Sequence, residues 1–383
     1  MIETLNQPHW GMLILAWFLA DIGMPLLIRI SPRLGAVDKP HSYKTHGQPV
    51  SFLGGLGITL AFGVAVFSLL RFDGFEPNRP LFMLLAGAGI ALAFGLWDDF
   101  RPIGAVLKLL MLVGVTAILE SQGIRLTVFP EALPGAPGWV HAAAHGANTA
   151  LTLLWLAGVT SAMNSVDNTV GAAAGLSAVA AFFMFLIAWR NYSDLGPLAK
   201  GMQRWVSLSM AATLGGCLGF LRYNWNGARI FLGNNGAFVL GYLLAGTAVL
   251  GNWSTNAVRA FLIPCCLLVV PLYDLTLATV LRIRHGVVRS WMGAVVYCGK
   301  DHLAHRLMAL GFSKPGAVGV MLLLGTVGGM LAYLLSRPWL GQTEAMIWVG
   351  AGLALLAVGG AVLDRAPVYG PSSTAESAPA RSA

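Results

Sequence analysis

The sequence predicts an all-α integral membrane protein with about eleven transmembrane helices. Of its 383 residues, 56% are hydrophobic and only 10% are charged, whereas soluble domains carry about a quarter of charged residues. The hydrophobic residues fall in runs that are long enough, as helices, to cross about 30 Å of hydrocarbon. The runs are residues 10–30, 50–70, 81–97, 104–119, 149–166, 171–189, 205–222, 235–250, 257–281, 316–335 and 344–363.

The first run is expected to remain in the protein as a transmembrane helix. It is too long for the hydrophobic region of a signal peptide, and no convincing small-residue cleavage site follows it. The cysteines stand in or beside the apolar runs without the spacing of metal ligands, so neither a disulfide framework nor a zinc site is expected. They are Cys217, Cys265, Cys266 and Cys298.

The basic residues predict the orientation. With the amino end outside, about 16 of the 24 Lys and Arg residues fall on the cytoplasmic side. This excess follows from topology, and it also suits an anionic partner. We expect one membrane domain over residues 1–365 and a disordered cytoplasmic tail over residues 366–383. The five inner segments are residues 31–49, 98–103, 167–170, 222–233 and 282–315.

The pair Asp98-Asp99 ends the third apolar run. Carboxylates beside hydrocarbon are costly unless a cation or a substrate holds them. Neighbouring side chains on a helix point about 100° apart, so different roles are natural, with one acid at a metal ion and the other a base or a support. The structural alternative is a solvated helix end.

The segment TSAMNSVDNTVG ends the fifth run. Asn164 and Asp167 are three residues apart and can share a helix face, where they would present an amide and a carboxylate to a polar ligand. A helix C-terminus closed by Asn168 and Gly171 is the structural alternative. That alternative leaves the acid unexplained, because the helix dipole disfavours negative charge at this end.

Histidines and basic residues mark two other inner segments. The first contains Lys44 and His46, and the last contains His302, His305 and Arg306. Such groups can bind phosphate or donate a proton to a leaving phosphate, whereas positive-inside charge is the alternative. Zinc is disfavoured here because a strong third ligand is missing. The same holds for His141 and His145 on the outer side, where residues 120–147 read as a Pro/Gly-rich connection.

Taken together, these segments resemble the polyprenyl-phosphate N-acetylhexosamine-1-phosphate transferase family, which moves a sugar phosphate from a UDP-sugar to a lipid carrier. The resemblance extends from about residue 33 to residue 317, with the motifs in the family's order. The matching residues are Asp38, Pro40, Lys44, His46, Asp98, Asp99, Lys108, Asn164, Asp167, Asn168, Gly171, Pro271, Asp274, His302, His305, Arg306 and Leu307.

The resemblance implies roles for these positions. Asp167 would bind Mg²⁺, or alternatively Mn²⁺, while Asp98 or Asp99 would assist the metal or deprotonate the lipid phosphate. The implied substrate-binding residues are Lys44, His46, Lys108, Asn164, Asn168, Asn234, His302, His305 and Arg306. Direct attack and a covalent aspartyl intermediate are both compatible with this set. The last loop, HLAHRL, looks more like the UDP-N-acetylglucosamine branch than the phospho-MurNAc-pentapeptide branch.

The resemblance also implies the setting. We expect a multi-pass enzyme of the inner (plasma) membrane with cytoplasmic catalytic loops, acting in cell-envelope synthesis on a UDP-sugar and a polyprenyl phosphate. No nucleic acid is expected, and the choice between monomer and homodimer stays open. Val170 and Asn234 stand where the family has acids, so a catalytically impaired relative acting in binding or assembly is the second hypothesis. A transporter is the third, although candidate residues gathered on one face argue against it.

Overall fold

The structure is a computed structural model of the chain. It describes residues 8–38, 48–72, 79–121, 124–131, 134–191, 197–225, 227–291, 293, 297 and 299–369. Lys44 and His46 lie outside the described residues, so their predicted substrate contacts stay predictions.

Each predicted apolar run coincides, to within a few residues at most boundaries, with a helix or a bent pair of helices. In chain order these are α2 (Pro8–Ile30), α3 (Gly54–Phe72), α4 (Arg79–Phe100), α5 (Ala105–Glu120), α6 (Gly138–Val166), α7 (Ala172–Asn191), α8 (Pro197–Asn224), α9 (Gly233–Leu250), α10 (Ala257–Leu267) with α11 (Val269–Arg284), α14 (Lys314–Leu335) and α15 (Gln342–Leu363). Six of the described helices are long and apolar enough to cross a membrane, and α10 with α11 makes a seventh if the pair is one span. The helical membrane protein is confirmed, and the count of eleven spans stays a prediction.

The ninth predicted span is broken. Between α10 and α11 the chain bends by 78°, at Leu268, whose backbone angles (φ −110°, ψ 23°) leave the helical region. Pro271 explains the break, because it lacks an N–H and its ring would clash with the carbonyl of residue 267 in a continuous helix. A hydropathy run registers apolar length and does not reveal this bend, so the predicted run over residues 257–281 is a bent pair of helices.

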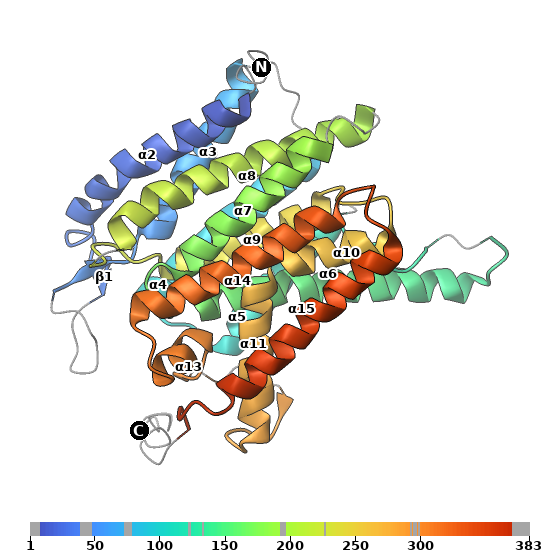
Figure 1. The fold of residues 1–383 in the computed structure, drawn as a ribbon. Helices are drawn as coiled ribbons and strands as arrows, with labels where there is room; N and C mark the ends of the chain where they lie inside the picture. The colour runs from blue at the N-terminus through green and yellow to red at the C-terminus, as the bar shows by residue number, and fades with distance from the viewer. Residues whose placement is uncertain are drawn as a thin grey trace.

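The start of α6 also differs from the prediction of a loop over residues 120–147. The helix is 29 residues long, which at 1.5 Å per residue is about 43 Å and more than the hydrocarbon thickness. Its first turns project sideways from the bundle (Figure 1). Buried Asn148 holds these turns against the segment that precedes the helix. Its side chain accepts hydrogen bonds from the backbone N–H groups of Val128 and Phe129 and donates one to the Glu131 carboxylate.

His141 and His145 both contact Glu131. His141 Nδ1 lies 2.7 Å from the Glu131 carbonyl oxygen, and His145 Nδ1 lies 3.6 Å from the Glu131 carboxylate. In the part of the chain that the structure describes, no three His, Cys, Asp or Glu side chains are grouped as metal ligands.

Burial separates central helices from peripheral ones. In α7, 78% of the most apolar stretch is buried, whereas in α15 the share is 6%, which fits a helix that faces lipid along most of its length. Asp21 in α2 forms an ion pair with Arg222 of α8 at 2.7 Å. The pair fastens two long neighbouring helices.

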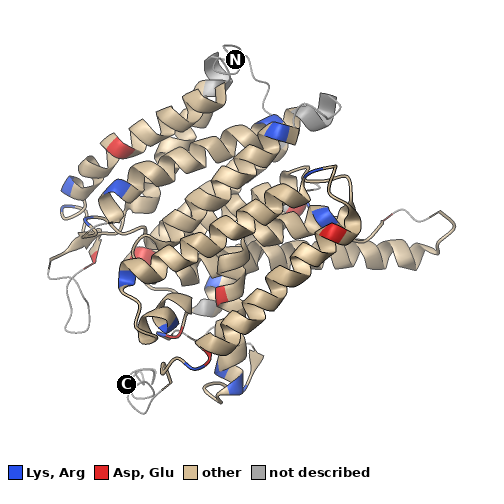
Figure 2. Ribbon diagram, viewed as in Figure 1, with Lys and Arg blue, Asp and Glu red and all other residues tan. Residues whose placement is uncertain are grey.

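Segments from distant parts of the sequence meet at one end of the bundle. Helix α2 begins at the end opposite to the one where α15 finishes (Figure 1), and most charged residues lie at helix ends and in connections (Figure 2). At the end where α15 finishes lie the short helix α13 (Leu303–Ala309) and the antiparallel strands β1 (Val37–Asp38) and β2 (Val50–Ser51). Ser51 also forms a parallel bridge with Ile230 before α9, so segments from distant parts of the sequence meet here.

Candidate active site

The carboxylate of Asp99, at the end of α4, caps the start of α9. Its Oδ1 accepts the Asn234 N–H at 2.8 Å, and its Oδ2 accepts the Asn235 N–H at 3.0 Å and the Asn235 side-chain amide at 2.6 Å. Negative charge is stabilised at a helix N-terminus. Gly233 opens the helix with φ +75°, and a Cβ there would lie 2.5 Å from the Phe52 carbonyl oxygen. This turn therefore requires glycine.

Asp98 serves a different contact from its neighbour, as the helical geometry predicted. Its Oδ1 accepts the Ile103 N–H at 2.8 Å, and its Oδ2 lies 2.6 Å from the Lys108 ammonium in α5. The Asp98 side chain is 1% exposed and that of Lys108 is 28% exposed. The predicted phosphate-binding lysine therefore neutralises a buried acid, and the metal-binding role predicted for Asp98 stays a prediction.

Asp167 stands at the C-cap of α6. Burial, and then the negative charge of nearby Asp99, raise the pKa of its carboxyl well above the usual value. The structural alternative for this segment is also present: the Asn168 amide donates to the Ser165 carbonyl at 2.7 Å, and Gly171 has φ +82°. Asn168 and Gly171 close the helix, whereas the helix end gives no reason for the acid at 167.

Asn224 is an organising residue that the sequence did not reveal. It is buried at the end of α8, where its Oδ1 accepts the Gly171 N–H and its Nδ2 donates to the Ile230 carbonyl, both at 2.8 Å. It thereby ties the segment after Asp167 to the segment before α9. A lone Asn at a helix end carries no signal in the sequence, because its partners are 53 and 6 residues away.

The described carboxylates suit Mg²⁺ in a limited way. Mg²⁺ is commonly held by one or two carboxylates together with substrate phosphates and water. Asp99 and Asp167 form such a pair, and a cation would relieve the repulsion that raises the pKa of the Asp167 carboxyl. Asn164, half-buried one turn before Asp167, and half-buried Asn234 at the start of α9 lie in the same segments. The rest of the coordination shell would come from substrate and water.

A second polar cluster surrounds the last loop. Buried Asp274, in α11, accepts the Leu303 N–H and lies 2.9 Å from His302 Nδ1. His302 Nε2 lies 3.2 Å from an Arg282 nitrogen. Because a guanidinium can only donate, Nε2 is the acceptor and Nδ1 carries the proton that His302 shares with Asp274. Both ring nitrogens of His302 are thus engaged by protein groups.

Asp301 joins the two buried arginines of this cluster. Arg282 donates to its two carboxylate oxygens at 2.6 and 2.7 Å, and Arg306 donates to its carbonyl at 2.7 Å. Burial opposes the charge of Asp301, but the hydrogen bonds and charge of Arg282 outweigh this effect and lower its pKa. Arg306 is 0% exposed, so its guanidinium faces protein groups.

His305 differs from these neighbours. It is half-buried, and its Nδ1 has no hydrogen-bond partner among the described residues. Burial lowers its pKa, so the neutral ring predominates near neutral pH. Of the three predicted diphosphate contacts, His305 alone retains an unengaged ring nitrogen in the part of the last loop that the structure describes, while His302 and Arg306 are engaged in its support.

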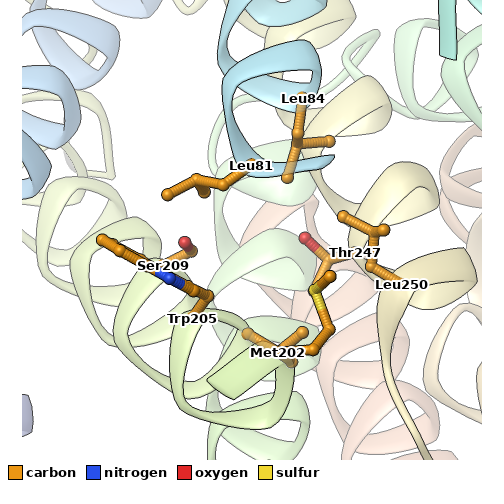
Figure 3. A pocket seen from close by; sticks show the side chains of 8 residues that line it. Leu81, Leu84, Met202, Trp205, Ser209, Thr247 and Leu250 are labelled. Atoms are coloured by element: carbon orange, nitrogen blue, oxygen red, sulfur yellow. The ribbon is translucent and has the colours of Figure 1, made fainter. Parts of the chain in front are cut away.

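The small cavity drawn in Figure 3 lies elsewhere. Leu81 and Leu84 of α4, Trp205 and Ser209 of α8 and Thr247 of α9 are among its lining residues. Leu81 and Asp98 are 17 residues apart on one helix, which at 1.5 Å per residue is about 25 Å. This apolar cavity is therefore separate from the acidic site.

A protein family whose model matches this chain covers the residues of the acidic site. The model of glycosyl transferase family 4 matches residues 81–252. This range includes Asp99, Asp167 and Asn224. The chain is 30% identical over 328 residues to a probable undecaprenyl-phosphate N-acetylglucosaminyl 1-phosphate transferase of Bacillus subtilis, covering 85% of this chain and 82% of that protein. The chain belongs to glycosyl transferase family 4.

Two further relatives of this family 4 member carry different names. A decaprenyl-phosphate N-acetylglucosaminephosphotransferase of Mycobacterium tuberculosis is 31% identical over 77% of this chain and 74% of its own length. A phospho-N-acetylmuramoyl-pentapeptide-transferase of Heliobacterium modesticaldum is 32% identical over 55% of this chain and 63% of its own. The predicted family resemblance is confirmed.

Proposed function

We propose that this chain transfers N-acetylhexosamine 1-phosphate, with N-acetylglucosamine as the sugar, from a UDP-sugar to a polyprenyl phosphate and releases UMP. The observation that carries the proposal is the pair of close carboxylates, Asp99 and Asp167, within the region matched by the transferase family. The two relatives named for N-acetylglucosamine transfer match three quarters or more of this chain. The product would enter cell-envelope polysaccharide synthesis.

The reaction joins two phosphates, so neutralising negative charge is its main demand. An oxygen of the lipid phosphate attacks the β-phosphorus of the UDP-sugar, a new P–O bond forms, and the bond to UMP breaks. Mg²⁺, when bound, supplies electrostatic stabilisation of the crowded phosphate oxygens. Asp167 and Asp99 would hold the ion, with Asp99 kept in place by the first turn of α9.

The other site residues act around this pair. Asn164 and Asn234, on the segments that carry Asp167 and cap Asp99, would bind polar groups of the substrates. His305 would contact the sugar-nucleotide diphosphate, and His302 and Arg306 would hold the loop that bears it. Lys108 neutralises Asp98, which keeps the end of α4 in register beside α5.

The topology belongs to the same proposal. We place eleven spans in the plasma membrane with the Asp99 end of the bundle in the cytoplasm, where UDP-sugars are made. Support comes from eleven apolar runs that match helices or a bent pair, and from the excess of Lys and Arg in the segments at that end.

The deciding experiment is an assay of the purified chain with UDP-N-acetylglucosamine, polyprenyl phosphate and Mg²⁺, following UMP release. Wild-type protein should turn over, and Asp167→Asn should abolish release while keeping a wild-type unfolding transition. An active relative serves as the control for assay conditions. No turnover by the wild-type chain beside an active control would refute the proposal and favour a catalytically impaired relative. Full activity of Asp167→Asn would remove the metal assignment.

A further inference from the structure

The segment after α15 is fastened to the last loop. Sequence composition predicted a disordered tail from residue 366, yet Ala366 is buried and residues 364–369 make specific contacts. The Asp364 carboxylate lies 2.7 Å from His285 Nε2 and 2.8 Å from an Arg284 nitrogen at the end of α11. Arg306 also donates to the Leu363 carbonyl at 3.3 Å. The end of α15, α11 and α13 lie together in Figure 1.

Tyr369 makes the central contact of this segment. Its hydroxyl donates to Asp301 Oδ2 at 2.7 Å and accepts from Arg306 Nη2 at 2.7 Å. The Arg306 guanidinium lies 4.9 Å from the centre of the tyrosine ring, and the ring of His285 lies 5.2 Å from it. One hydroxyl therefore bridges the acid that precedes α13 and the arginine within it.

This bridge continues into the predicted substrate-binding loop. Asp301 binds Arg282, Arg282 donates to His302, and His302 donates to Asp274. Removing the tyrosine hydroxyl would deprive the fully buried Arg306 of an acceptor and Asp301 of a donor. Buried charged groups do not tolerate lost partners without rearrangement. The start of α13, which also carries His305, would then shift.

We propose that Tyr369 is a positioning residue: its hydroxyl holds Asp301 and Arg306 so that the start of α13 presents His305 to the diphosphate of the UDP-sugar. The contact of His305 with the diphosphate rests on the proposed transferase function, whereas the hold of Tyr369 on Asp301 and Arg306 rests on their hydrogen bonds alone. Tyr369 contacts Asp301 and Arg306, and we propose no contact between Tyr369 and the substrate.

The test compares Tyr369→Phe with Tyr273→Phe in the full-length protein. Tyr273 also donates one hydroxyl hydrogen bond across to α15, to the Leu356 carbonyl at 2.9 Å, so its variant loses a similar bond away from the loop. We expect Tyr369→Phe to raise the KM for UDP-N-acetylglucosamine about tenfold, as loss of a hydrogen bond to a charged group can. The KM for polyprenyl phosphate and both values in Tyr273→Phe should stay as in the wild type.

Amide hydrogen exchange gives a readout that does not depend on turnover. Exchange in residues 303–309 should accelerate about tenfold in Tyr369→Phe and stay unchanged in Tyr273→Phe. If residues 303–309 of Tyr369→Phe exchange at the wild-type rate, the positioning role is overturned, even if the wild-type chain proves inactive as a transferase. A lower kcat with both KM values unchanged would mean a smaller active fraction, and would overturn the link to the UDP-sugar.

Discussion

Replacing Lys108 by Met tests whether this lysine balances Asp98 or binds substrate phosphate. The substitution removes the ammonium and keeps an apolar stem of similar length. Asp98 would then retain one donor, the Ile103 N–H, and its side chain, 1% exposed, has little water to replace the lost charge. The buried carboxylate would be left without a counterion.

The structure sets the expected size of this effect. Removing one partner of a buried ion pair costs about 3–5 kcal/mol. Because 28% of the Lys108 side chain is exposed, water reaches this end of the pair, so we expect the lower figure, about 3 kcal/mol, for Lys108→Met. Asp98→Asn removes the buried charge and leaves a partly hydrated lysine, which should cost about 1 kcal/mol.

The double variant separates the two roles. If the residues act as a pair, Lys108→Met in the Asp98→Asn background should add less than about 1 kcal/mol, a coupling of about 2 kcal/mol. Unfolding in mixed detergent and dodecyl sulfate, followed by tryptophan fluorescence, measures each free energy. A single-variant cost below about 0.5 kcal/mol, or strictly additive costs, would refute the pairing argument. Stability regained without regained affinity for the UDP-sugar would instead support the predicted phosphate contact of Lys108.

Three further outcomes can be measured on single variants. Burial lowers the pKa of His305, so the contribution of the neutral ring to stability is complete above about pH 6.5 and is lost as the pH falls toward the lowered pKa. His305→Gln should therefore make the unfolding midpoint less dependent on pH between about pH 7 and about pH 5. Val170 is 42% exposed, so the Val170→Asp variant should fold normally. If the wild-type chain is already active, this variant should raise the rate of UMP release less than about threefold. A gain of about tenfold or more would mark the wild type as catalytically impaired. Asn224→Ala leaves the Gly171 N–H and the buried Ile230 carbonyl without their side-chain partner. It should lower the unfolding free energy by about 3 kcal/mol in the same detergent titration. A change under about 1 kcal/mol would mean that water replaces the side chain.

Most of the helices were predictable because hydrophobic length is a property of the local sequence. The eleven runs and the helices agree, and the different directions of Asp98 and Asp99 followed from the angle between neighbours on a helix. The bend at Leu268 was missed, although Pro271 marks its place, since apolar length does not report direction. The ordered start of α6 was missed because its stability comes from Asn148 and its hydrogen bonds to the segment that precedes the helix.

By itself, the sequence determined the membrane class, the family resemblance and the set of polar residues on which function would depend. Only the tertiary structure decided which of those residues remain available. It assigned Lys108 to Asp98, Asp99 to the first turn of α9, and His302 and Arg306 to the support of their loop, and it brought Tyr369 onto Asp301. The physical reason is that a buried charge must be paired, and the partner that satisfies it is chosen by the packing of segments that can be more than a hundred residues apart.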